Sequence, residues 1–108
     1  MERISLKFGE ILYKQGDKGP CFFVLDGKVH LESATRKATA SAGEFAGLSS
    51  FARRPYFFTA FGGEGGAQVM SFKRDELLEF VRTGEEAEVK RVMDAMFAQL
   101  TELIEHTR

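Results

Sequence analysis

The chain has 108 residues, 44% of them hydrophobic, which is enough for one domain with a packed core. Its 15 basic residues nearly balance its 16 acidic ones, and a formal net charge of −1 provides no overall field to hold a nucleic acid. A single cysteine, Cys21, excludes an internal disulfide and fits a reducing compartment, and no stretch is apolar enough for a signal peptide or membrane helix. We therefore expect a cytoplasmic protein that binds neither nucleic acid nor membrane.

The first half of the chain predicts short β-strands separated by turns. Ile4, Leu6 and Phe8 alternate with polar residues, and the segment 15–20, "QGDKGP", is rich in turn formers. The apolar runs "CFFVL" and "KVHLE" are separated by Asp26 and Gly27. An Asp-Gly pair between two such runs is typical of a tight β-hairpin, so we expect the chain to reverse there.

Three more strands are predicted before the pattern changes. A short polar strand is expected over residues 37–40, ending near Gly43. The runs "YFFTAFG" and "AQVMSF" lie on either side of "GGEGG", a composition that predicts two strands joined by a flexible turn.

The last third of the chain predicts two helices. Asp75 precedes the run "ELLEFV", and Thr83 and Gly84 mark the end of this short helix. From Glu85 onward, a second helix carries apolar residues spaced four, three, four and three apart, the seam of a coiled coil: Val89, Met93, Met96, Leu100 and Leu103. We expect this seam to form a homodimer; the alternative is that the helix only covers its own core.

The order of these motifs resembles the cyclic nucleotide-binding domain of bacterial catabolite-activator-type regulators, protein kinase A regulatory subunits and gated channels. The matching residues in "FGEILYKQGDKGPCFFVLDGKVHLE" are Gly9-Glu10, Gly16-Asp17, Phe22-Phe23-Val24-Leu25 and Gly27-Lys28-Val29. The resemblance implies an eight-stranded, jelly-roll-like β-barrel with C-terminal helices, formed by residues 1–84, followed by a dimerisation helix of the same domain over residues 85–108.

The resemblance also implies where a ligand would bind. In that family a cassette of the form Phe-Gly-Glu-Leu-Ala-Leu, followed by Pro-Arg-x-Ala-Thr, holds the cyclic phosphate. Backbone N–H groups at a helix start and the arginine bind the anion, and the glutamate accepts from the ribose hydroxyl. The residues here that match are Phe45, Leu48, Pro55 and Thr59, whereas Ala46, Gly47 and Tyr56 stand in place of the glycine, the glutamate and the arginine.

Both charged anchors of a cyclic nucleotide are therefore missing, at a cost of ~1.5–3 kcal/mol for each lost charge-assisted contact. The remaining candidate contacts are Phe45, Thr59 and the backbone of Gly47, Leu48 and Ser49. The hydroxyls of Ser49 and Ser50 either help to hold the anion or only cap the helix. Arg54 either reaches the pocket or stays in solvent. Tyr56 either stacks on a base or fills the vacated pocket as core, which we favour. Candidate ligands are cAMP, cGMP or another small anion.

These observations predict a regulatory sensor domain with weak, altered or lost cyclic nucleotide binding. The alternative is a homodimer without ligand that acts as a protein interaction module. An enzyme is not expected, because no nucleophile motif is present and the two histidines, His30 and His106, are far apart and have no ligand-spaced partners for a metal site.

Overall fold

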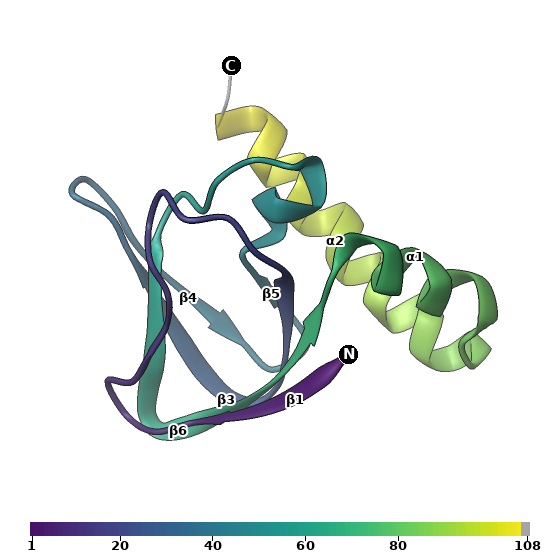
Figure 1. Ribbon diagram of the computed structural model, residues 1–108, viewed down its shortest axis with the longest axis horizontal. Helices are drawn as coiled ribbons and strands as arrows, with labels where there is room; N and C mark the ends of the chain where they lie inside the picture. Colours follow the sequence, from purple (N-terminus) through teal and green to yellow (C-terminus); the bar gives the residue numbers. More distant parts are fainter. Residues whose placement is uncertain (107–108) are drawn as a thin grey trace.

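The protein is described by a computed structural model that covers the backbone of residues 1–106 and the side chains of residues 1–100. An antiparallel sheet is followed by two helices (Figure 1). The strands are β1 (Glu2–Leu6), β2 (Ile11–Tyr13), β3 (Cys21–Glu32), β4 (Lys37–Ser41), β5 (Phe45–Ala46) and β6 (Thr59–Phe72). A short 3-10 helix η1 (Leu48–Ala52) follows β5, and the chain ends with α1 (Arg74–Thr83) and α2 (Glu86–His106).

The two longest strands, β3 and β6, form the centre of the sheet. They pair from Cys21 opposite Phe72 to Glu32 opposite Thr59. Strand β1 pairs with β6 and β4 with β3, which gives the order β1-β6-β3-β4, while β2 adds to β6 and β5 to β3. The expected class, mainly β of the jelly-roll type with C-terminal helices, is confirmed. The expected strand number is wrong, because six strands form a sheet that does not close.

The predicted Asp-Gly hairpin is wrong. Asp26 and Gly27 lie inside the continuous strand β3, where the register with β6 shifts on both sides of them. Gly27 has a φ of 77° and packs against the carbonyl of Gly66, so the glycine serves a β-bulge that bends the strand. A glycine with positive φ fits a β-bulge as well as a hairpin turn, so the Asp-Gly pair is compatible with both. The pairing of β3 with β6 on both sides of Gly27 makes it a bulge here.

The predicted glycine-rich turn is wrong for the same reason. Gly65 and Gly66 both have positive φ, yet they lie inside β6, which continues from Thr59 to Phe72. Each expected hairpin is thus one long, bent strand, and the two bends face each other across the β3–β6 pair (Figure 1). The start of β6 is also later than expected, so Tyr56 lies in the loop before it.

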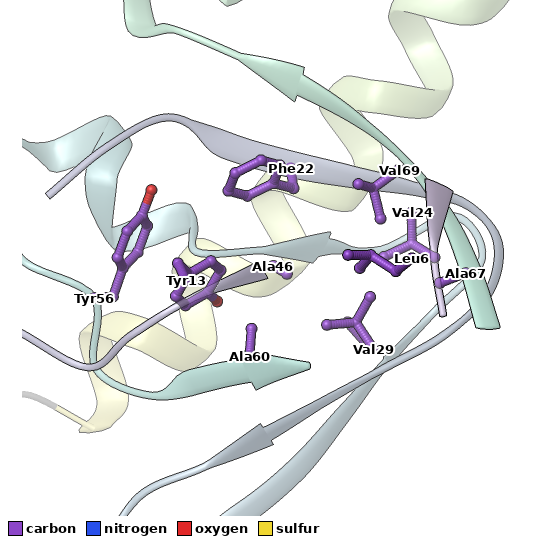
Figure 2. Packing of buried hydrophobic residues seen from close by; sticks show 11 residues of the cluster. Leu6, Tyr13, Phe22, Val24, Val29, Ala46, Tyr56, Ala60, Ala67 and Val69 are labelled. Atoms are coloured by element: carbon purple, nitrogen blue, oxygen red, sulfur yellow. The ribbon is translucent and has the colours of Figure 1, made fainter. Parts of the chain in front are cut away.

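Two hydrophobic clusters hold the domain together. The first fills the curved sheet, with Tyr13 and Tyr56 at one end and Leu6, Val24 and Ala67 at the other (Figure 2). The second joins the sheet to the helices and contains Cys21, Phe23, Phe45, Leu48, Phe72, Leu77 and Val92. Phe45 and Leu48 belong to the second cluster, so the cassette segment is packed between the sheet and the helices.

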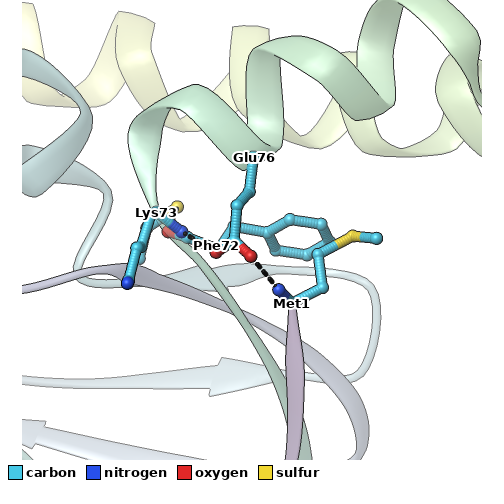
Figure 3. Close-up of polar contacts among 5 residues, drawn as sticks. Met1, Phe72, Lys73 and Glu76 are labelled. Atoms are coloured by element: carbon cyan, nitrogen blue, oxygen red, sulfur yellow. Dashed lines mark hydrogen bonds and ion pairs between the residues drawn. The ribbon is translucent and has the colours of Figure 1, made fainter.

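Helix α1 ends at Thr83 as predicted, and it begins at Arg74, just before the predicted run after Asp75. The Lys73 N–H donates to the Glu76 carboxylate at 2.9 Å, and this carboxylate also pairs with the amino group of Met1 (Figure 3). At the other end the Gly84 N–H donates to the Phe80 carbonyl at 2.7 Å. Glu76 therefore caps the first turn, and the backbone turn at Gly84 closes the last one.

Helix α2 uses part of the predicted seam in its own domain. Met96 and Leu100 pack against the second cluster, beside the buried Val92. Phe97, the residue after Met96, is 64% exposed. Leu103 lies outside the residues whose side chains are described. In the described part of the chain, neither helix combines the length and apolar character needed to cross a bilayer.

Candidate functional site

The cassette segment forms a tight loop that begins at Gly47. This residue has a φ of 74°, and a Cβ atom placed on it would lie 2.9 Å from Cε1 of Tyr56 and 3.2 Å from Cε2 of Tyr13. Both the backbone and the packing therefore require glycine where the related cassette has glutamate. The loop ends at Arg53, a non-glycine residue with a φ of 60°.

Ser49 holds this loop closed. Its hydroxyl donates to the Pro55 carbonyl at 3.0 Å, and its own carbonyl accepts from the Arg54 N–H at 3.1 Å. The hydroxyl considered as an anion donor is thus engaged inside the loop. These two hydrogen bonds of Ser49 hold the backbone at Arg54 and at Pro55.

Tyr56 is a core residue in this structure. It is 3% exposed, its ring stacks on Tyr13 with 3.8 Å between centroids, and its hydroxyl donates to the Pro20 carbonyl at 2.6 Å (Figure 2). The Tyr56 N–H donates to the Asp17 carbonyl, and its carbonyl accepts from the Gly16 N–H, both at 2.9 Å. Burial, with smaller contributions from Cys21 and Asp17, raises the pKa of Tyr56 to about 12, so the phenol is neutral at physiological pH.

An open cavity of about 540 Å³ lies beside the loop. This volume is within the range of ~300–1,000 Å³ that is usual for small-molecule sites. The predicted residues that line it are Phe45, Gly47, Leu48, Ser49 and Arg54. Tyr56 and Thr59 do not line it; the hydroxyl of Thr59 accepts from the Gln15 N–H at 3.1 Å in the adjoining wall.

Much of the cavity wall was missed by sequence reasoning. The further lining residues come from the turn after β2, the β3–β4 hairpin, the loop before β6 and helix α2, and they include Gln15, Leu31, Ser33, Thr35, Arg36, Ala38, Thr39, Glu44, Phe57, Phe58 and Gln99. No local motif marks them, because only the pairing of β3 with β4 and the packing of α2 bring them to one space.

Gln99 is the connection between α2 and the cassette. Its side-chain amide donates to the Phe45 carbonyl and accepts from the Phe45 N–H, both at 2.7 Å. The side chain thus mimics a neighbouring strand at the start of β5. Gln99 therefore links helix α2 to strand β5 beside the cavity.

The described lining residues of the cavity combine charged, polar and apolar side chains. Among the described lining residues, the charged ones are Arg36, Arg54 and Glu44, and the Glu44 carboxylate accepts from the Ser41 N–H at 2.8 Å. Among the described residues, no group of three His, Cys, Asp or Glu side chains is placed to hold a metal ion. The described part of the wall therefore offers hydrogen-bonding groups.

No protein-family model matches the sequence, and no curated protein is similar enough to count as a match. Solved structures with the same fold include the Thermus thermophilus catabolite activator protein, at 21% identity and a TM-score of 0.71 over 98% of this chain and 51% of that one. A candidate cyclic nucleotide-binding protein from Geobacter metallireducens matches at 20% identity and a TM-score of 0.68, over 94% of this chain and 76% of that one. The c-di-GMP responsive regulator CLP of Xanthomonas campestris matches at 18% identity and a TM-score of 0.71, over 99% of this chain and 56% of that one.

These likenesses define the class: the chain has the fold of the cyclic nucleotide-binding domains. It spans about half the length, 51%, of the Thermus thermophilus protein. The comparisons do not support excluding nucleic acid as a partner, because CLP is described as a regulator that links cell-cell signalling to virulence gene expression. The balanced charge of this domain was the basis for that exclusion, and it describes this domain alone.

Proposed function

We propose that this chain is a regulatory sensor domain that binds a small anionic, nucleotide-like ligand in the cavity beside η1, with a cyclic nucleotide preference that is weak or altered. The observation that carries the proposal is the open cavity of about 540 Å³. Tyr56, which stands in place of the cassette arginine, is buried in the core and does not line that cavity. Its ring therefore does not occupy the space proposed for a ligand.

The contacts that support ligand binding come from the loop and from helix α2. Gly47, Leu48 and Ser49 line the cavity at the start of η1. Gln99 lines it as well and holds Phe45 through two hydrogen bonds. A ligand that draws the loop inward would therefore shift α2, which is the proposed output of the sensor.

The role we propose is binding, in the cytoplasm, and not catalysis. The cavity combines arginines and hydroxyls, with no histidine among the lining residues that the structure describes, and the fold is shared with regulators. A screen for turnover of nucleotides and esters tests this part of the proposal, since product formation that depends on the protein would contradict it.

Calorimetric titration tests the sensor proposal. The protein is titrated with cAMP, cGMP and cyclic di-GMP, up to millimolar concentration. Saturable binding that is weakened by Ala38→Val, which would add bulk to the cavity wall on β4, supports the proposal. Ala42→Val, at an exposed position outside the cavity, is the control and should bind like the wild type. The absence of saturable binding would contradict the sensor proposal.

A second candidate function is a homodimeric interaction module. An apolar groove of about 180 Å³ between α1, α2 and η1 favours it, with Leu78 and Phe97 at 50% and 64% exposure. The groove is lined by Phe51, Leu77, Leu78, Val81, Met93, Met96, Phe97 and Leu100. The predicted seam residues Met93, Met96 and Leu100 are among them, and Val89 is not.

Light scattering tests this second candidate. Phe97→Glu should convert a dimer to a monomer, whereas Ala98→Glu, on the exposed neighbour outside the groove, should not. We choose Phe97 because a charge at Met96 or Leu100 would also disrupt the domain's own core. A wild-type monomer, or a dimer that survives Phe97→Glu, would contradict dimerisation through this groove.

A further inference from the structure

We propose that the hydroxyl group of Tyr13 binds the ligand by donating a hydrogen bond to an uncharged acceptor, a carbonyl oxygen or a ring nitrogen. This inference rests on the proposed sensor function and specifies how the cavity recognises the body of its ligand. Tyr13 ends strand β2, pairs with Ala60 of β6 and lines the cavity, although only 8% of the residue is exposed.

The Tyr13 hydroxyl has no hydrogen-bond partner among the residues whose side chains the structure describes. In that part of the chain, no fully enclosed side-chain nitrogen or oxygen lacks a partner, so this oxygen is not sealed in the core. It therefore opens onto the cavity that Tyr13 lines. The stacked neighbour Tyr56 differs, since its hydroxyl donates to the Pro20 carbonyl at 2.6 Å, and Figure 2 shows the two phenol oxygens pointing in different directions.

The ring of Tyr13 is held in place by its own domain. It stacks on Tyr56 with 3.8 Å between ring centroids and on Phe22 with 5.8 Å. A Cβ atom at Gly47 would lie 3.2 Å from Cε2 of Tyr13, so the loop packs against the ring. A hydroxyl on a fixed ring loses little further entropy when it binds a ligand. Burial, with smaller contributions from Tyr56 and Cys21, raises the pKa of Tyr13, so the phenol keeps its proton and can donate it to a hydrogen bond.

The buried part of the cavity wall favours an uncharged partner for this hydroxyl. Ala40, Phe45 and Leu48 belong to it, and all three are apolar and at most 6% exposed. Ser49 is buried there as well, but its hydroxyl donates to the Pro55 carbonyl. An anion would lose its hydration in such surroundings at a greater cost than one phenol hydrogen bond returns, whereas a carbonyl oxygen or ring nitrogen loses much less.

The exposed part of the wall suits the charged groups of the ligand. The charged residues among the described lining residues are all exposed: Arg36, Glu44 and Arg54. The ligand therefore enters with its uncharged ring first and keeps its charged groups near water at the opening of the cavity.

Calorimetry on two matched variants tests the inference. Tyr13→Phe removes only the hydroxyl, and the control Tyr56→Phe removes the hydroxyl of the stacked neighbour, which does not line the cavity. Both variants and the wild type are titrated with cAMP, cGMP and cyclic di-GMP, at low and at high salt. We expect Tyr13→Phe to weaken the binding of the tightest of these probes about three- to tenfold, and Tyr56→Phe to bind it within about twofold of the wild type.

The effect of Tyr13→Phe should be the same at both salt concentrations, because a hydrogen bond between uncharged groups is not screened. Urea denaturation without ligand examines the same hydroxyl. Tyr13→Phe should keep the wild-type midpoint, because the hydroxyl has no partner to lose in the described part of the chain, whereas Tyr56→Phe should lower it by breaking the bond to Pro20. Equal decreases of the midpoint in the two variants would overturn the inference, because the Tyr13 hydroxyl would then be bonded within the protein.

The binding data separate this inference from the sensor function. If the wild type binds a probe and Tyr13→Phe binds it equally well, or if the effect of Tyr13→Phe shrinks at high salt, the inference is overturned and the sensor function stands. The failure of the wild type to bind any of the three probes would overturn both.

Discussion

The side chain of Gln99 and the backbone of Phe45 form a closed pair of hydrogen bonds, in which the amide nitrogen donates to the carbonyl and the amide oxygen accepts from the N–H, both at 2.7 Å. The pair joins helix α2 to strand β5, and its two residues are 54 positions apart in the sequence. Helix α2 is therefore fixed to the segment that begins the cavity wall.

Breaking this pair should destabilise the domain. Gln99→Leu leaves both polar groups of a buried backbone unit without a partner, and we expect a loss of ~2 kcal/mol in the free energy of unfolding, measured by urea denaturation. Gln68→Leu is the control, because Gln68 accepts only from the exposed Ser5 hydroxyl and should cost ~0.5 kcal/mol or less. Equal losses for the two variants would contradict the role of Gln99.

Restoring the arginine of the related cassette should not restore cyclic nucleotide binding. Tyr56→Arg replaces a buried, stacked ring with a charge at a position that does not line the cavity, so we expect no gain in cAMP affinity and a loss of at least ~3 kcal/mol in stability. Tyr56→Phe keeps the ring, loses the hydrogen bond to Pro20 and should cost only ~1 kcal/mol. A stable Tyr56→Arg variant that binds cAMP would show that position 56 does reach the ligand.

The close approach at Gly62 should make it less tolerant of a side chain than Gly65. A Cβ at Gly62 would meet the Lys7 carbonyl, and the strands cannot separate there because Gly62 exchanges hydrogen bonds with Gly9 and Glu10 at 2.8 and 2.9 Å. We expect Gly62→Ala to cost ~3 kcal/mol by urea denaturation.

Gly65→Ala tests the other cause of glycine preference. Its φ is +81° and no atom lies within 4 Å of the added Cβ, so only the backbone conformation is strained, at ~1–2 kcal/mol. If this variant were the more damaging of the two, the approach of β6 to the chain near Lys7 would be wrong.

Stability should fall at alkaline pH because of Cys21. Burial, opposed weakly by a backbone hydrogen bond, raises the pKa of this thiol from 9.0 to about 12. As pH rises through that window, the unfolded chain loses the proton first, so the stability present below pH 9 is progressively lost. Between about pH 8 and pH 10 the loss should reach ~1 kcal/mol, measured from urea midpoints.

The variant Cys21→Ala isolates this effect from that of Tyr56, whose raised pKa of about 12 acts in the same direction. We expect a smaller decrease of stability between the two pH values in Cys21→Ala than in the wild type. The same pH dependence in both proteins would mean that the thiol is ionised equally in the folded and unfolded chains.

Local patterns predicted the parts of the fold that depend on neighbouring residues. The short strand near residues 37–40 and the helix after Asp75 form as expected, because their signals are alternation, capping and a terminating glycine. The same logic was wrong at Asp26-Gly27 and at "GGEGG", where the glycines serve bulges inside β3 and β6. A preference for positive φ can be predicted from the glycine itself, whereas the strand that pairs with the segment around it lies far away in the sequence.

The candidate site, too, could be predicted only in part from the sequence. By itself, the sequence determined the class of fold, which depends on the order and spacing of residues along the chain. Of the predicted segment from Phe45 to Thr59, the part up to Arg54 contributes predicted residues to the cavity wall, whereas Tyr56 and Thr59 do not line it. Only the tertiary structure decided that Tyr56 belongs to the core and that Arg36 and Gln99 belong to the cavity wall. The physical reason is that membership of a cavity depends on which distant strands and helices pack together, and no spacing within one segment records that packing.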